Sequence, residues 1–145
     1  MAGVEANTRV MDISPDHETF LLGRFTFRGS QSSLWLLPVQ GGNPIRLANI
    51  ESGEAVWTPD GNHILYGQDH ELWIVAADGT GARLFATLPG GPHWLVWSPN
   101  GTRLRLTIDD DTGNSALWEL RDDGSRLHRK RLVFPSGQVV SGGRR

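Results

Sequence analysis

The chain has no cysteine among its 145 residues, and lysine occurs once, at Lys130. Without cysteine there is no disulfide, no thiolate nucleophile and no cysteine-ligated zinc or iron–sulfur cluster. No run of about 18 consecutive apolar residues is present, so we expect no membrane span. Residues 1–10 lack the basic start and apolar core of a secretory signal. We expect this chain to stay in the cytoplasm; a longer parent protein is compatible with the periplasm or a membrane anchor.

A strong charge of either sign is also missing. Lys and Arg total 14 and Asp and Glu total 16, which gives a formal net charge of −2. No global field therefore draws the chain to nucleic acid. Positive side chains do gather between Arg121 and Arg131, but their spacing along expected strands favours a solvated outer face. We expect no nucleic-acid partner.

Glycine, proline and tryptophan are frequent, and one short pattern occurs three times. Residues 13–17 read ISPDH, residues 57–61 read WTPDG and residues 97–101 read WSPNG. Each copy precedes an apolar segment and then a Leu-Trp pair, which falls at residues 34–35, 72–73 and 117–118. A repeat of about 40 residues with four short strands is typical of a propeller blade. The sequence therefore predicts an all-β chain, a partial β-propeller of about three four-stranded antiparallel blades.

Each repeat carries the alternation of a strand. The positions five and seven residues after the proline are apolar in all three copies, whereas the position between them is Leu21, Leu65 and then Arg105. Gly-Gly or Asp-Gly follows each Leu-Trp strand and supplies the positive φ angles of a hairpin turn. A last strand is expected to end in Arg-Leu, at residues 46–47, 83–84 and 131–132.

The repeats divide the chain into five parts. Residues 1–11 are interpreted as an N-terminal extension, 12–50 as a degenerate first blade, 51–92 and 93–133 as two further blades, and 134–145 as a disordered C-terminal tail. The first blade is degenerate because Ile13 and His17 replace the Trp and Gly of the other copies. Terminal repeats often depart from the pattern in this way.

Taken together, Trp-Ser-Pro-Asp/Asn-Gly, Leu-Trp, Asp-Gly and Arg-Leu resemble the WD-like repeats of TolB-type β-propellers over about residues 12–133. The arrangement is similar to the sensor-like propellers of bacterial winged-helix regulators and Ser/Thr kinases, and prolyl oligopeptidase-type peptidases share the repeat. The resemblance implies a disc of blades that binds proteins or peptides, or that gates a neighbouring catalytic domain. Three blades are too few to close a ring. We therefore expect a fragment of a larger propeller, or self-association through exposed edge strands.

Catalytic and metal-binding patterns are weak throughout. The segment 109–114 (DDDTGN) resembles a calcium loop, but Leu120 stands where an EF-hand has its bidentate Glu. The five histidines lack metal-ligand spacing, and no Gly-x-Ser-x-Gly nucleophile turn is present. We expect no enzyme activity, no catalytic residue, no metal and no cofactor.

The candidate binding residues carry aromatic, titratable or charged side chains at places that the repeat does not dictate. They are Trp94, His93, His70, Arg28 and Asp110. Four other tryptophans, at 57, 73, 97 and 118, recur at fixed positions and are expected to pack between blades. The leading hypothesis is a non-catalytic propeller module for protein or peptide binding. A regulatory or substrate-gating fragment of a peptidase or kinase is the alternative, and a purely structural product is the third.

Overall fold

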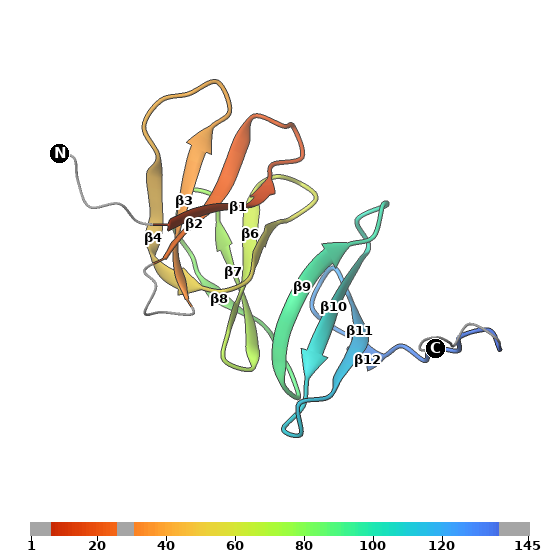
Figure 1. Ribbon diagram of the computed structural model, residues 1–145. Helices are drawn as coiled ribbons and strands as arrows, with labels where there is room; N and C mark the ends of the chain where they lie inside the picture. The colour runs from red at the N-terminus through yellow and green to blue at the C-terminus, as the bar shows by residue number, and fades with distance from the viewer. Residues whose placement is uncertain (1–6, 26–30, 137–145) are drawn as a thin grey trace, which may run out of the picture.

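Three four-stranded antiparallel sheets make up the computed structural model, which describes residues 7–25 and 31–136 (Figure 1). The first blade contains β1 (Asn7–Ile13), β2 (Thr19–Phe25), β3 (Ser32–Pro38) and β4 (Ile45–Ser52). The second contains β5 (Ala55–Trp57), β6 (His63–Gln68), β7 (Glu71–Ala76) and β8 (Arg83–Thr87). The third contains β9 (Gly91–Trp97), β10 (Arg103–Asp109), β11 (Ser115–Arg121) and β12 (His128–Arg129). The predicted all-β class and the three four-stranded blades are confirmed.

Two details differ from the sequence analysis. β1 begins at Asn7 and pairs with β2, so the first sheet extends into residues 1–11, which were assigned to an extension. The repeat marks the turn after this strand and not the strand itself, which explains the error. The last strand of the third blade is His128–Arg129, so Arg131 and Leu132 lie beyond it. The tail predicted for 134–145 lies mostly outside the described residues, and no helix of the described part is long and apolar enough to cross a membrane.

The turn between the first two strands of each blade is built from side-chain hydrogen bonds. In the second blade, the Thr58 hydroxyl donates to Asp60 Oδ1 at 2.6 Å, and the Gly61 N–H donates to the Thr58 carbonyl at 2.9 Å. The same pattern recurs around Ser14 and Ser98. These short polar residues cap the turn without help from the core, which explains why the motif can be recognised in the sequence alone.

A left-handed residue completes each of these turns. Gly61 and Gly101 have φ angles of 74°, and His17 at the equivalent place has a φ of 65°. A side chain makes this conformation costly, whereas glycine adopts it freely. The degenerate first repeat thus keeps the turn geometry although it has His17 where the other repeats have glycine.

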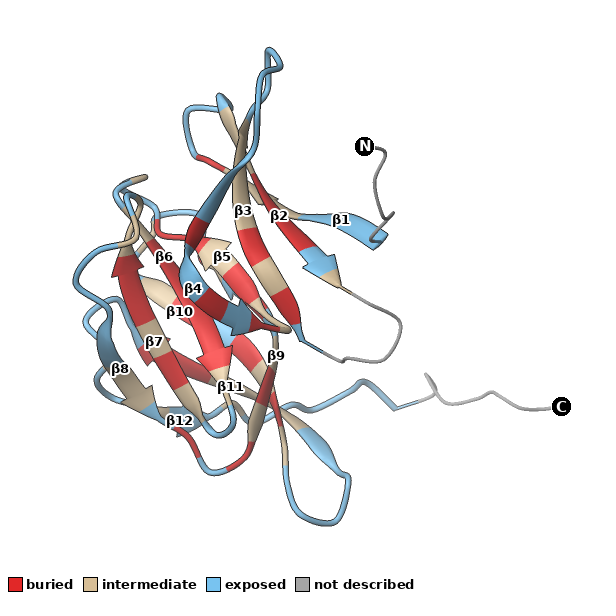
Figure 2. Cartoon of the chain, turned by 90° about the vertical axis from the view of Figure 1, so that its left-hand side faces the viewer, coloured by how far each residue is buried: buried red, intermediate tan, exposed pale blue. Residues whose placement is uncertain are grey.

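Blades pack through two apolar clusters on opposite faces of the second sheet (Figure 2). Along β6, Ile64 and Tyr66 belong to the cluster shared with the first blade, and Leu65 belongs to the cluster shared with the third. This alternation follows from the two-residue period of a strand, and a sheet buried on both faces needs apolar residues at every position. Trp57 and Trp73 lie in or against the first cluster, and Trp97 and Trp118 pack against the second, as expected.

The outer sheets each leave one face without a neighbouring blade. On the first sheet this face carries Leu22 opposite Trp35 and Phe20 opposite Leu37, which we call the first free face. On the third sheet it carries Arg105 opposite Glu119, which we call the last free face. The centre of the first free face is apolar, and the centre of the last free face is charged.

Candidate functional site

One end of the strands carries the connections between blades and the turns that join the second and third strands of each sheet. We call it the connector end; the opposite end carries the Pro-containing turns. A hollow of about 370 Å³ opens here, lined by residues of all three blades. Its lining residues are Arg9, Gln31, Gly53, Glu54, Gly67, Asp69, Gly91, Pro92 and His93. Loops held in place by rigid sheets are the usual location of binding residues.

His93 lies between two carboxylates from different blades. Its Nε2 is 2.8 Å from Asp109 Oδ2 on the neighbouring strand β10, and its Nδ1 is 3.8 Å from Glu54 Oε2 on the connection before β5. The His93 side chain is 44 % exposed, so solvent and ligands reach the imidazole. His93 thereby links a carboxylate on the connection before the second blade to a carboxylate of the third blade.

Trp94 follows directly and is the most unusual aromatic residue of the chain. Its residue surface is 74 % exposed, and its backbone has a φ of 58°. The ladder between β9 and β10 shifts register over Arg105–Thr107, opposite this residue, so Trp94 lies in a β-bulge. Its N–H donates to Glu54 Oε1 at 3.0 Å. Bulges and left-handed non-glycine residues are common beside binding sites because they redirect a side chain.

The backbone around Glu54 is fixed by the second blade. The Gly67 N–H donates to the Glu54 carbonyl at 3.0 Å, and the Ser52 hydroxyl donates to the same carbonyl at 2.8 Å. A Cβ on Gly67 would lie 2.9 Å from Pro92 Cγ, so glycine is required for the connection to the third blade to approach this closely. These bonds fix the backbone from which the Glu54 side chain reaches His93.

Arg9 brings the first blade into the site. Its guanidinium donates to the Gly53 carbonyl at 3.0 Å and lies 5.7 Å from the centre of the Phe25 ring. Asp69, with a φ of 52°, occupies the turn between β6 and β7 on the other side of the hollow. Three carboxylates, of Glu54, Asp69 and Asp109, therefore accompany one arginine and one histidine. This acidic balance attracts basic groups.

The predicted site residues fall into three groups. His93 and Trp94 are adjacent in the site. His70 is exposed in the neighbouring turn, where its carbonyl accepts from the Leu88 N–H at 2.8 Å, but it does not line the hollow. Arg28 lies outside the described residues. The binding role of these residues stays a prediction.

Asp110 is committed to its own turn. Its Oδ1 accepts from the Thr112 hydroxyl at 2.6 Å, from the Thr112 N–H at 2.9 Å and from the Asn114 N–H at 3.0 Å. The Thr112 hydroxyl bond is the main cause of the lowered pKa of this carboxyl. These bonds give Asp110 a structural role in the turn. Within the described residues, no group of three or more histidines and carboxylates could hold a metal ion.

The sequence analysis missed Glu54, Asp69 and Arg9. They lie in blades other than that of His93, at positions with no shared motif, so only the packing of the sheets brings them together. The one available signal was a charged residue beside each connection between blades, which is weak because exposed loops often carry charge.

No known family profile matches this chain. A curated relative, an uncharacterized peptidase YuxL of Bacillus subtilis, is 28 % identical over 91 residues, which is 58 % of this chain and 14 % of that protein. The chain thus spans a small part of the curated relative that it matches.

Solved structures share the architecture more completely. A putative TolB from Agrobacterium tumefaciens has a TM-score of 0.70 at 16 % identity, covering 89 % of this chain and 50 % of that one. The nidogen/laminin complex gives 0.67 at 16 % identity, over 81 % of this chain and 45 % of that one. TolB from Acinetobacter baumannii gives 0.57 at 17 % identity, over 84 % and 31 % respectively. This chain therefore has the fold of TolB-like β-propellers, and it spans half or less of the length of these structures.

Proposed function

We propose that the chain is a non-catalytic β-propeller module that binds a protein or peptide at the connector end of its blades. The observation that carries the proposal is Trp94, an exposed indole held in a left-handed bulge beside the His93–Glu54–Asp109 group. Exposed tryptophans are enriched among the residues that dominate binding energies. The propeller fold by itself supports many functions, so the argument depends on this site.

The chemistry of the site favours a basic side chain in the ligand. Glu54 and Asp109 present carboxylates, and the neighbouring indole offers a ring face on which a guanidinium can stack. Arginine combines both requirements because its planar cation forms bidentate bonds to carboxylates and stacks on aromatic rings. We therefore expect a peptide with an exposed Arg, bound across the hollow between the second and third blades.

The test is a screen of fluorescein-labelled peptides against the full chain by fluorescence anisotropy. Peptides with Arg at one position are expected to bind, and their norleucine counterparts are expected to bind at least about tenfold more weakly. Trp94→Ala is expected to weaken binding by a similar factor. Val96→Ala is the matched control, because Val96 is also exposed on β9 but lies farther along the strand from the carboxylates.

Two results would contradict the proposal. Equal losses for Trp94→Ala and Val96→Ala would place the binding elsewhere or make it a folding effect. Cleavage of the bound peptides that is lost in His93→Ala would indicate an enzyme and not a binding module. Mass spectrometry of the peptides after incubation distinguishes binding from cleavage.

A second candidate is favoured by the partial similarity to the peptidase YuxL. In this hypothesis the chain is the regulatory or substrate-gating part of a longer peptidase, and the connector-end site contacts the substrate. Sequencing of the gene and its flanking reading frame tests this hypothesis directly. A continuous frame with a Gly-x-Ser-x-Gly segment would favour this candidate, and its absence would favour the independent binding module.

We further propose that the first free face packs against a blade of a second copy of this chain. Phe20, Leu22, Trp35 and Leu37 occupy positions whose counterparts in the other blades are buried or packed against a neighbouring blade. Light scattering after size exclusion measures the mass of the full chain. A discrete oligomer that dissociates in Leu37→Glu would support packing between copies, and a monomer, or an oligomer that Leu37→Glu leaves intact, would contradict it.

A further inference from the structure

The outermost strand of the third blade is much shorter than its counterparts. β12 has two residues and pairs with two residues of β11, whereas β4 has eight residues and β8 has five. In the second blade, β8 pairs with Glu71 and Leu72 at the start of β7. The equivalent residues at the start of β11 are Ala116 and Leu117, and no strand of the described part pairs with them on that side.

Backbone groups on this edge point outward. The Lys130 N–H donates to the Leu117 carbonyl at 2.8 Å, which shows that Leu117 faces the outer side of the sheet. In an antiparallel ladder, residues two apart present their N–H and C=O groups to the same side. Ser115 therefore also faces outward, and the open edge runs over Ser115–Leu117.

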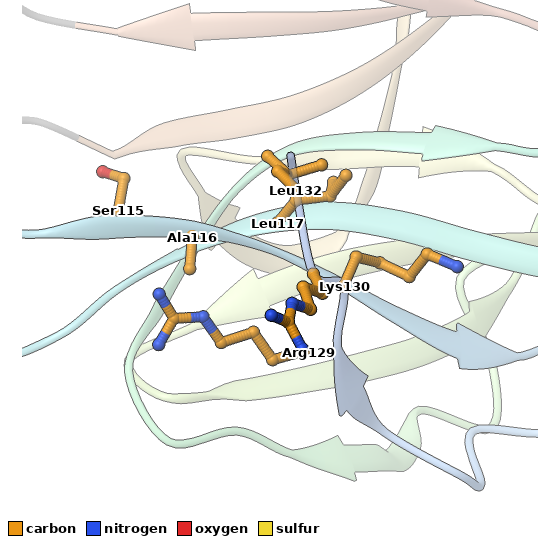
Figure 3. A pocket seen from close by; sticks show the side chains of 7 residues that line it. Ser115, Ala116, Leu117, Arg129, Lys130 and Leu132 are labelled. Carbon is orange, nitrogen blue, oxygen red and sulfur yellow. The ribbon is translucent and has the colours of Figure 1, made fainter. Parts of the chain in front are cut away.

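A hollow of about 390 Å³ lies between this edge and the chain that leaves β12 (Figure 3). Its lining residues are Ser115, Ala116, Leu117, Arg129, Lys130, Arg131 and Leu132. Three consecutive residues of the lining are basic. Lys130 lies 3.7 Å from Glu119, while the described part of the chain offers Arg129 and Arg131 no carboxylate within 4.0 Å. Leu132 is 56 % exposed and lines the hollow together with Leu117.

We propose that the open edge of β11 binds an acidic, extended peptide segment of a partner protein, which adds to the third blade as a strand. The Leu117 carbonyl is already bonded to the Lys130 N–H, so main-chain bonds to Ser115 and to the Leu117 N–H supply the affinity of such an added strand, and the side chains around it supply specificity. Carboxylates on one side of the segment pair with Arg129 and Arg131. Apolar side chains on the other side contact Leu117 and Leu132.

Charge argues against the chain's own C-terminal residues as the occupant. Residues 137–145 contain two arginines and no acidic residue, so they would add positive charge to a basic hollow. The edge adjoins the connector-end site, because the Ser115 hydroxyl donates to Asp109, the carboxylate that also lies beside His93. The two sites attract ligands of opposite charge, and variants of Arg129 and Arg131 test the edge while leaving Ser115, Asp109 and His93 unchanged.

Fluorescence anisotropy with a short labelled peptide that alternates Glu and Val tests the proposal on the full chain. We expect this peptide to bind, and its Lys-Val counterpart to bind at least about tenfold more weakly because its charge is reversed. An acidic peptide with proline at alternate positions is expected to lose most of the affinity, since proline cannot donate to a strand ladder. Hydrogen exchange of the Ser115 and Leu117 amides is expected to slow when the Glu-Val peptide is bound.

Variants of the protein distinguish binding at this edge from nonspecific electrostatic attraction of the acidic peptide. The double variant Arg129→Glu/Arg131→Glu is expected to weaken the Glu-Val peptide about tenfold or more. Arg83→Glu on β8 is the matched control, an exposed strand arginine in another sheet whose reversal is expected to change binding less than twofold. Circular dichroism confirms that both variants are folded.

Any of three peptide results would overturn the proposal: failure of the Glu-Val peptide to bind, equally strong binding of the proline peptide, or equal losses of binding in Arg83→Glu and in the double variant. Equal binding of a single-stranded RNA oligonucleotide, lost in the same double variant, would also overturn it, because the surface would then recognise polyanions rather than an added strand.

Discussion

The first and last free faces lie at the two ends of the arc, yet their central cross-strand pairs differ in chemistry: Leu22 lies opposite Trp35 on the first, and Arg105 lies opposite Glu119 on the last. The cross-strand pair Leu65–Ile74 of the second blade lies buried against the third blade. The same pair in the third blade is Arg105–Glu119, whose Nε and Oε2 atoms are 2.8 Å apart. The second sheet needs an apolar pair because a neighbour covers it, and the third sheet replaces that pair by an ion pair.

Other basic side chains surround the central pair of the last free face. Arg103, His128 and Lys130 lie 3.9, 3.5 and 3.7 Å from Glu119 Oε1, while the Glu119 residue is only 5 % exposed. Long basic side chains thus cover the sheet and keep their charges in water. The terminal repeats of stacked arrays use polar outer faces of this kind for solubility.

On the described part of the first free face, charge is confined to the margins: Arg46 and Glu51 pair on β4 at 3.6 Å, and Arg24 lies 5.6 Å from the Trp35 ring centre. The centre of that face is apolar, whereas the centre of the last free face is an ion pair.

The largest effect is expected when an arginine, as found at Arg105 on the last free face, is placed at the equivalent covered position of the second sheet. Leu65→Arg places a cation at a fully buried position between the second and third blades and is expected to reduce the free energy of unfolding by more than about 3 kcal/mol. Arg105→Leu, the reverse exchange at the equivalent position, is expected to cost less than half as much. Urea unfolding followed by tryptophan fluorescence compares them, and equal costs would contradict the distinction between covered and free faces.

A smaller loss is expected when the ion-pair network loses its centre. Glu119→Ala leaves Arg103, Arg105, His128 and Lys130 without their shared carboxylate, and we expect a loss of about 1–2 kcal/mol in the free energy of unfolding. The loss is expected to shrink in 1 M salt, since screening weakens both the pairs and the remaining repulsion. A salt-independent loss would indicate that packing, rather than charge, explains the role of Glu119.

The turns of the first and second blades give the next comparison. Gly61→Ala is expected to lose about 1 kcal/mol because a left-handed φ is strained for a residue with a side chain. A Cβ at Gly61 would lie 3.6 Å from Pro15 Cδ, an ordinary contact, so the cost is conformational. His17→Gly is expected to gain up to about 0.5 kcal/mol, since relief of strain is partly offset by the entropy of the unfolded chain. Thermal unfolding of both variants checks the two signs.

The smallest effects concern the pH dependence of stability, to which Asp12 and Glu119 contribute with opposite signs. Burial raises the pKa of Asp12, although N–H bonds from Trp57 and Ile13 oppose it. Bonding to Arg105 instead lowers the pKa of Glu119, with help from the charges of Lys130 and His128. Asp12 therefore contributes stability that is present below its unfolded pKa of about 3.9 and is lost as the pH rises through its folded pKa.

Glu119 contributes stability that is present above its unfolded pKa of about 4.3 and is lost as the pH falls through its folded pKa. Unfolding free energies of Asp12→Asn and Glu119→Gln between pH 3 and 7 show each slope as a difference from the unsubstituted chain. We expect the advantage of the unsubstituted chain over Glu119→Gln to decrease with acid, and its advantage over Asp12→Asn to increase with acid. Parallel slopes in the two variants would contradict the assigned causes.

Sequence patterns were reliable where a local cause operates. The turns at Ser14, Thr58 and Ser98 close through bonds between residues two to five apart, so the motif and its structure coincide. The sequence singles out His93 and Trp94 because they stand outside the repeat, and their binding role stays a prediction. Glu54 and Arg9 were not found, because their relation to His93 depends on the packing of three sheets.

Most strands, their turns and the number of blades could be predicted from the sequence, since hydrogen bonding and apolar alternation act over a few neighbouring residues; β1 and the end of β12 could not. Arg105 stood out in the sequence as a charged residue at an apolar position, without a reason for the exception. The reason comes from the packing, in which Arg105 pairs with Glu119 on a face that no described blade covers. The tertiary structure also decided that β12 stops early beside an open edge and that carboxylates of two blades meet at His93. The physical reason is that the pairing of charges, the covering of faces and the exposure of edges depend on distances between segments far apart in the chain.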